Sequence, residues 1–244
     1  MKRWFPHAKP RANAALRLFC LPYAGGGASV YRLWGSVFPE SVEIWAVQPP
    51  GRETRFTEPG FTRVRDYASA LVTAIRPLLD RPFAFFGHSL GALMAFETIR
   101  TLRAQGLPLP VRLFASARRA PHLPHTTELV HALPEPQLID HLRRLGGTPE
   151  AVLTNVELRQ LMLPVLRRDF EVLETYEHQP EPPLDVPLRA FGGEGDALAP
   201  TETLQAWGQH TRSFLGVRSF PGGHFYLNDV REPLVRAILE DLPR

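Results

Sequence analysis

A Gly-His-Ser-Leu-Gly motif at residues 87–91 constrains the fold more than any other feature of the chain. The pattern G-x-S-x-G alone has a substantial false-positive rate, but here an apolar run, 83–86, precedes it and a helical pattern from Ala92 follows it. A strand, a tight turn and a helix in this order make a nucleophile elbow, whose strained turn exposes the serine hydroxyl. We therefore expect Ser89 to be a nucleophile and the Leu90 amide, at the start of the helix, to stabilise an oxyanion.

Short apolar runs alternate with helical patterns along most of the chain, which is typical of an α/β protein with a mostly parallel central sheet flanked by helices. Each run is apolar over nearly its whole length, as a strand buried on both faces must be. The predicted strands are Leu16–Leu21, Val42–Val47, Phe83–Phe86, Val111–Ala115, Leu188–Phe191 and Phe214–Phe220. The predicted helices include Thr62–Leu79, Ala92–Gln105 with Gly106 as its stop, and Asp229–Leu242 with Asp229 as its cap.

The segment from about 122 to 178 breaks this alternation. It contains no good strand, but two or three amphipathic helical patterns separated at residues 146–149. A helical insertion at the carboxyl ends of parallel strands would lie over the ligand crevice as a lid, although it could instead be an elaboration that only adds packing. The length of 244 residues suits one domain, so we expect a single domain, 1–244, with a lid insertion at about 122–178.

A base for Ser89 is expected near the C-terminus, because triad residues in this arrangement follow in the order serine, acid, histidine. His224 comes directly after the last predicted strand; the alternative is an ordinary surface-loop histidine. The acid should follow the preceding strand, where Asp196 is a better candidate than Glu194, and Asp169 in the insertion is a weaker one. The other histidines lack this placement, since His88 belongs to the elbow itself and the rest fall in or around the insertion: His122, His125, His131, His141 and His178.

A second oxyanion donor is expected from the glycine-rich loop after the first strand, residues 21–27. The amide of Ala24 is the preferred candidate. Without the elbow, this loop would be read as a flexible turn, and its spacing fits neither the dinucleotide-binding nor the P-loop fingerprint.

Composition and charge exclude several classes of function. The positively charged start is followed by no apolar run long enough for a signal peptide or a membrane span, so we expect a cytoplasmic protein with no membrane partner. The net charge is +3, and the basic residues cluster only as pairs, such as the arginines at 118–119. Because no basic run is longer than such pairs, the sequence argues against nucleic acid as a partner. The one cysteine, Cys20, lies within a predicted strand and is expected to be buried and inert.

Longer motifs resemble those of the type II thioesterases of polyketide and nonribosomal peptide synthesis, a family of the α/β-hydrolase superfamily. The resemblance spans nearly the whole chain and leaves out only residues 1–15. The matching segments are 18–26 (LFCLPYAGG), 48–53 (QPPGRE), the elbow at 87–91, 113–121 (LFASARRAP), 145–149 (LGGTP), 163–170 and 222–225 (GGHF).

This resemblance implies an α/β-hydrolase fold with a helical lid, a triad of Ser89, Asp196 and His224, and oxyanion amides at Ala24 and Leu90. It implies removal of stalled or misprimed acyl groups from the phosphopantetheine arm of acyl or peptidyl carrier proteins, by a monomer. A Ser-His-Asp mechanism requires no metal and no organic cofactor. Arg52 and Glu53, within residues 48–53, are expected to anchor a loop.

Three alternatives remain open. A carboxylesterase or lipase would use the same triad with a different acyl pocket. An acyltransferase would pass the acyl group from the serine to an alcohol or an amine. A binding protein on the same fold would perform no chemistry, but it would not require three intact triad positions.

Overall fold

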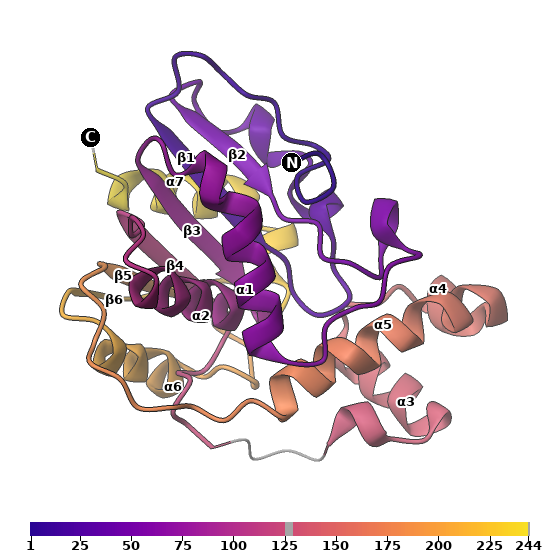
Figure 1. The fold of residues 1–244 in the computed structure, drawn as a ribbon. Helices are drawn as coiled ribbons and strands as arrows, with labels where there is room; N and C mark the ends of the chain where they lie inside the picture. The colour runs from indigo at the N-terminus through magenta and orange to yellow at the C-terminus, as the bar shows by residue number, and fades with distance from the viewer. Residues whose placement is uncertain (125–128, 244) are drawn as a thin grey trace.

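A six-stranded sheet forms the centre of the computed structural model, which describes residues 1–124 and 129–243 (Figure 1). The strand order is β2-β1-β3-β4-β5-β6, and every pairing is parallel. All six strands predicted from the sequence are present, as β1 Leu16–Leu21, β2 Val42–Ala46, β3 Phe83–His88, β4 Arg112–Ser116, β5 Leu188–Gly193 and β6 Phe214–Phe220.

Helices cover both faces of this sheet, which explains why its strands are apolar throughout. On β1, Phe19 packs on the side of α1 (Val64–Ile75) and α2 (Leu90–Ala104), whereas Cys20 packs on the side of α7 (Arg231–Asp241). Figure 1 shows α1 and α2 in front of the sheet and α7 behind it. Burial raises the pKa of the Cys20 thiol well above its ordinary value, so this thiol behaves as a small apolar group, as expected.

The predicted cap of the last helix is wrong. The helix α7 begins at Arg231, and its N-terminal flanking residue is Val230, whose side chain makes no capping hydrogen bond. Asp229 lies instead in the preceding turn, where its amide donates to the Tyr226 carbonyl at 3.0 Å. Asp229 therefore belongs to the turn that follows the 3₁₀ segment Tyr226–Asn228, and it does not cap the helix.

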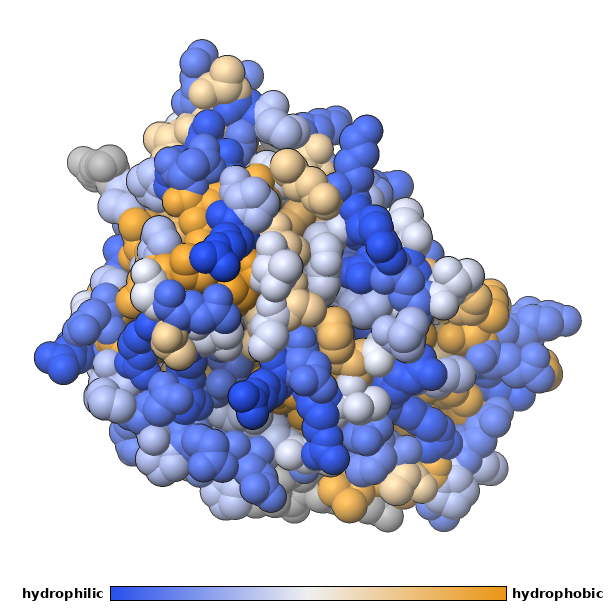
Figure 2. Space-filling view, viewed as in Figure 1, coloured by the Kyte–Doolittle hydropathy of each residue, from blue (hydrophilic) through white to orange (hydrophobic). Residues whose placement is uncertain are grey.

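The region between β4 and β5 is helical, and its described residues contain no strand. It holds α3 (Glu135–Leu145), α4 (Glu150–Thr154) and α5 (Val156–Glu174), which gather beside the sheet at the lower right of Figure 1. We call this group of three helices the helical insertion. Figure 2 shows apolar side chains at the surface around α4 and α5, where Val156, Leu158 and Leu161 are exposed. The short α6 (Thr201–Gln205) follows β5.

Residues 1–15, outside the resemblance, pack against the β2–β1 edge. Phe5 is buried, and its ring lies 5.7 Å from that of Phe19 and 5.3 Å from that of Trp45. The Trp4 carbonyl accepts a hydrogen bond from the Gln48 amide at 2.8 Å. The N-terminal segment therefore completes the core beside β2.

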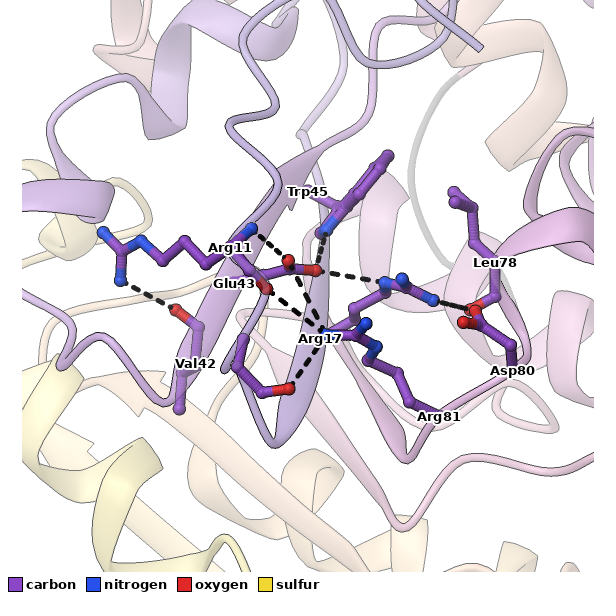
Figure 3. Close-up of polar contacts among 9 residues, drawn as sticks. Arg11, Arg17, Val42, Glu43, Trp45, Leu78, Asp80 and Arg81 are labelled. Carbon is purple, nitrogen blue, oxygen red and sulfur yellow. Dashed lines mark hydrogen bonds and ion pairs between the residues drawn. The ribbon is translucent and has the colours of Figure 1, made fainter.

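A buried carboxylate fixes the same segment to the sheet (Figure 3). Glu43, on β2, is 2% exposed and accepts hydrogen bonds from the Arg11 amide at 2.5 Å, the Arg17 Nε at 3.1 Å and the Trp45 Nε1 at 2.9 Å. Arg17 also bonds to Asp80.

Within the described ranges, no helix is long and apolar enough to cross a membrane.

Candidate active site

The serine of the elbow sits on a strained turn between β3 and α2. Ser89 has φ 54° and ψ −113°, a conformation that costs a non-glycine residue about 1–3 kcal/mol. The neighbouring glycines are required by close approach, since a Cβ on Gly87 would lie 2.2 Å from the Gly91 carbonyl oxygen. A Cβ on Gly91 would lie 2.1 Å from the Leu21 carbonyl oxygen on β1. The turn therefore fits only this pattern of small residues.

The structure brings the three predicted triad side chains together in one hydrogen-bonded chain. The His224 Nε2 lies 3.0 Å from the Ser89 Oγ, and the His224 Nδ1 lies 2.8 Å from the Asp196 Oδ2. Asp196 is buried and its Oδ1 accepts from the Leu198 amide at 2.9 Å, which holds the carboxylate in place. The competing acid Glu194 is exposed. This geometry allows the imidazole to take a proton from the serine while the carboxylate stabilises the imidazolium.

A buried polar network beneath the triad was not predicted from the sequence. The His88 Nε2 lies 2.8 Å from the His224 carbonyl oxygen, and its Nδ1 lies 2.8 Å from the Ser116 Oγ. Ser116 in turn lies 2.6 Å from the Tyr226 hydroxyl. Burial, and next the neighbouring His224, hold the pKa of His88 well below its ordinary value, so this ring stays neutral. His88 therefore supports the backbone of the His224 loop from within the elbow.

The second acid competitor, Asp169 on α5, is bound elsewhere. Its carboxylate forms a bidentate pair with Arg52, at 2.5 Å and 2.8 Å, and accepts from the Gly25 amide at 2.7 Å. Glu53 accepts from the Ser29 hydroxyl at 2.5 Å. Arg52 and Glu53 thus anchor loops, as expected. The Asp169 carboxylate binds Arg52 and the glycine-rich loop, so it does not serve as the acid that contacts His224.

Two backbone amides remain available near Ser89. The Gly25 amide is used by Asp169, whereas neither the Ala24 amide nor the Leu90 amide donates a hydrogen bond to any described residue. Leu90 is the first residue of α2, where amides lack partners within the helix and favour negative charge. Among the described residues, nothing therefore occupies the two amide donors that the sequence predicted.

A cavity of about 130 Å³ opens beside Ser89 and His224. The helical insertion contributes five side chains to its apolar wall, Leu142, Leu145, Leu166, Phe170 and Leu173. The α3–α4 turn approaches closely, since a Cβ on Gly147 would lie 2.1 Å from the Phe225 ring, next to His224. An apolar, partly enclosed chamber at a nucleophile is suited to binding an acyl chain.

The described histidines in or around the insertion lie in different environments and do not form one cluster. His141 lines the cavity, and His131 pairs with Glu174. His122 and His178 lie beside His210, with the His122 Nδ1 2.7 Å from the His210 Nε2. His125 falls outside the described residues. Among residues 1–124 and 129–243, no three His, Cys, Asp or Glu side chains are grouped so that they could hold a metal ion.

Comparisons with known proteins identify the family. The thioesterase domain family matches residues 16–242. The gramicidin S biosynthesis protein GrsT of Aneurinibacillus migulanus is 40% identical over 242 residues, which cover 99% of this chain and 94% of GrsT.

Solved structures agree with that match. RedJ, a thioesterase from the prodiginine biosynthetic pathway in Streptomyces coelicolor, superposes with a TM-score of 0.90 and 39% identity over 97% of this chain and 95% of its own. BorB, a type II thioesterase from the borrelidin biosynthetic cluster, superposes with a TM-score of 0.88 and 36% identity over 97% and 96% of the two chains. With its α/β-hydrolase sheet, the chain therefore belongs to the thioesterase domain family and is a serine hydrolase that cleaves thioesters.

Proposed function

We propose that this chain is a type II thioesterase that hydrolyses acyl groups from the phosphopantetheine arm of acyl or peptidyl carrier proteins. The observation that carries the proposal is the 3.0 Å contact between the Ser89 Oγ and the His224 Nε2 at the wall of an apolar cavity. The names of BorB, a type II thioesterase, and of GrsT and RedJ, from gramicidin S and prodiginine biosynthesis, support the substrate class.

Acylation begins when the Ser89 Oγ attacks the thioester carbonyl carbon and His224 takes the hydroxyl proton. Asp196 holds the imidazole in the required tautomer through the Nδ1 contact of 2.8 Å. The tetrahedral intermediate then collapses, the carbon–sulfur bond breaks, and the His224 proton passes to the departing pantetheine sulfur. The product is an acyl-serine and a free thiol.

The negative oxygen of the intermediate is stabilised by the backbone amides of Ala24 and Leu90. Loss of one such donor costs about 100- to 1000-fold in rate in a serine hydrolase. The strained turn at Ser89 supports this arrangement, because it places the hydroxyl at the start of α2, next to the Leu90 amide.

Water completes the reaction. His224 takes a proton from a water molecule as its oxygen attacks the acyl-serine, and then returns the proton to the Ser89 Oγ, which releases a carboxylic acid. Because Ser89, His224 and water handle every proton and electron pair, we propose that the enzyme works without a metal or an organic cofactor.

We also propose that the chain acts as a single domain and as a monomer, with residues 122–178 as a lid. One chain supplies every residue of the proposed site. The helices α3 and α5 contribute apolar side chains to the same cavity as Ser89, so movement of these helices would open or close the acyl chamber.

The test is deacylation of a loaded carrier protein. A carrier bearing acetyl or longer acyl groups on its phosphopantetheine arm is incubated with wild type and with Ser89→Ala, and the intact mass of the carrier is followed. An activated oxygen ester is assayed in parallel. We expect the wild type to remove the acyl group and Ser89→Ala to be slower by a factor of up to about a million.

Two outcomes would contradict the proposal. If the carrier stays loaded while the oxygen ester is hydrolysed, the enzyme is a carboxylesterase with the same triad. If Ser89→Ala strips the carrier as fast as the wild type, Ser89 is not the nucleophile. The matched control is Ser36→Ala, which removes a hydroxyl whose described hydrogen bond is a local one to the Leu33 carbonyl.

A further inference from the structure

The loop that carries Ala24 forms a tight turn of defined geometry. The Gly26 amide donates to the Tyr23 carbonyl at 2.9 Å, and Gly25 has φ 79°, as the third residue of a type II turn does. The peptide unit that joins Tyr23 to Ala24 is trans, so its N–H points away from its C=O. Because that carbonyl points into the turn, the Ala24 amide points out of it. The orientation of the turn therefore decides where the proposed oxyanion donor points.

Two side chains from outside the loop hold this turn. The Asp169 carboxylate accepts from the Gly25 amide at 2.7 Å, and the Arg52 Nη1 donates to the Gly26 carbonyl at 3.2 Å. Arg52 and Asp169 also bind each other through two hydrogen bonds, and both side chains are buried. A bidentate ion pair is specific in geometry as well as in energy, so it fixes the positions of both groups that hold the turn.

One face of α5 lies against the turn and also lines the acyl cavity. Leu166 comes three residues before Asp169, and residues at this spacing share a helix face. A Cβ on Gly25 would lie 2.6 Å from the Leu166 Cδ2, so α5 packs directly on the turn. Leu166 and Ala24 both line the cavity beside Ser89. One helix of the insertion therefore contacts both the acyl chamber and the loop of the oxyanion donor.

We propose that Asp169 is a positioning residue, which orients the Ala24 amide through the Gly25 amide, so that the oxyanion site is complete only while α5 packs on the turn. This inference rests on the proposed thioesterase mechanism, because it requires Ala24 to be an oxyanion donor. Such a donor must lie within about 2.7–3.1 Å of the position that the oxyanion takes. A displaced turn therefore slows the chemical step, whereas binding of the acyl chain, which uses the apolar wall, is retained.

The principal test is Asp169→Asn. Asparagine has the shape of aspartate, but its NH2 group cannot accept from the Arg52 guanidinium, so the bidentate pair is lost. Two ligands separate transition-state from ground-state binding. An alkyl boronic acid forms a tetrahedral anion when the Ser89 Oγ adds to boron and His224 takes the proton, and this anion uses the oxyanion donors. A pantetheine thioether with the same alkyl chain has no carbonyl and does not use them.

The enzyme is assayed on the matching acyl-pantetheine thioester, and kcat is expressed per folded molecule, with the folded fraction taken from circular dichroism. We expect kcat and the affinity for the boronic acid to fall in parallel by about 10- to 100-fold, since the donor is displaced and not removed. KM and the affinity for the thioether should change by about twofold or less. A purely structural role would not produce this split.

The matched control is Glu43→Gln, which weakens another buried pair between a carboxylate and an arginine, at the β2 edge. It should cost stability without changing kcat per folded molecule. A second variant, Arg52→Lys, keeps a positive charge beside Asp169 but not the planar fork. It keeps the inference testable if Asp169→Asn does not fold, and we expect the same split with a smaller fall in kcat.

Three results would overturn the inference. Unchanged kcat and boronic-acid affinity would mean that the turn keeps its geometry without the carboxylate. Equal losses of affinity for the boronic acid and the thioether would make Asp169 a structural residue of the whole cavity. A fall in kcat with unchanged boronic-acid affinity would assign Asp169 to a step other than oxyanion binding. In each case the proposed function stands if the wild type cleaves the thioester, and if it does not, the proposed function fails together with this inference.

Discussion

The guanidinium of Arg52 and the carboxylate of Asp169 form a buried bidentate ion pair across 117 positions of the chain. Their side chains are only 8% and 5% exposed. Burial by itself would lower the pKa of Arg52, but Asp169 outweighs it and raises the pKa. Because the same carboxylate accepts from the Gly25 amide, one side chain joins α5 of the helical insertion to the loop that carries Ala24. The helical insertion and the proposed oxyanion loop are therefore mechanically linked.

Breaking this pair should destabilise the protein strongly. In Arg52→Met the Asp169 carboxylate stays buried without its counter-ion, so the free energy of unfolding should fall by about 3–5 kcal/mol. Urea unfolding measures this change. The matched control is Arg218→Met, which breaks an exposed pair with Glu240 and should cost about 1 kcal/mol or less. Equal effects of the two substitutions would mean that the buried pair contributes no more than a surface contact.

Isosteric substitution of Asp196 and of its neighbour Glu194 distinguishes which carboxylate is the triad acid. Asp196→Asn keeps the shape and the contact with the Leu198 amide, but it no longer holds His224 in the required tautomer. We expect kcat to fall by about ten thousandfold with little change in stability. Glu194→Gln, on an exposed neighbour, should leave kcat unchanged. The assignment of the acid is wrong if Glu194→Gln is the slower enzyme.

Much of the fold was predictable because its signals are local. Buried parallel strands must be apolar throughout, so β1 occupies the same residues, Leu16–Leu21, that its composition predicts. The elbow was predictable because its turn requires small residues at fixed offsets from Ser89. Parallel strands also place their carboxyl ends at one edge, which brings the loops of Asp196 and His224 to the elbow.

The polar contacts between distant segments were not predictable. Nothing near Arg52 in the sequence marks Asp169 as its partner, since their meeting depends on how α5 packs on the sheet. Glu43 alternates with apolar residues in β2 and looks like a solvent-facing position, but the N-terminal segment covers it. Asp229 had a residue type that favours helix capping, yet the preceding turn decided where the helix begins.

The elbow glycines should not tolerate a methyl group. Gly91→Ala would place a Cβ 2.1 Å from a backbone oxygen of β1, which cannot move without disturbing the sheet. We expect a loss of about 3 kcal/mol or more in the free energy of unfolding, together with loss of thioesterase activity. Gly35→Ala is the control, because no described atom outside its own chain neighbours lies within 4 Å of its added Cβ. A Gly91→Ala protein with the stability and activity of Gly35→Ala would contradict the close approach.

Glu43 should make stability depend on pH in the acid range. Burial by itself would raise the pKa of this carboxyl, but hydrogen bonds from the Arg11 amide, Trp45 and Arg17 outweigh burial and lower the pKa below its ordinary value of 4.5. A carboxyl with a lowered pKa in the folded state stabilises the protein above its unfolded pKa. That contribution is lost as the pH falls through the lower, folded pKa.

The measurement compares wild type with Glu43→Gln, a neutral side chain of the same shape. Near pH 7 the variant leaves the buried Arg17 without its full partner, and its free energy of unfolding should be lower than that of wild type by about 3 kcal/mol. Between about pH 5 and pH 3 the difference should shrink, because the wild-type carboxyl then becomes protonated and resembles glutamine. Glu240→Gln, which alters an exposed pair, should show only a small difference at every pH. A Glu43→Gln difference that stays constant down to pH 3 would show that the ionised carboxylate does not stabilise the fold.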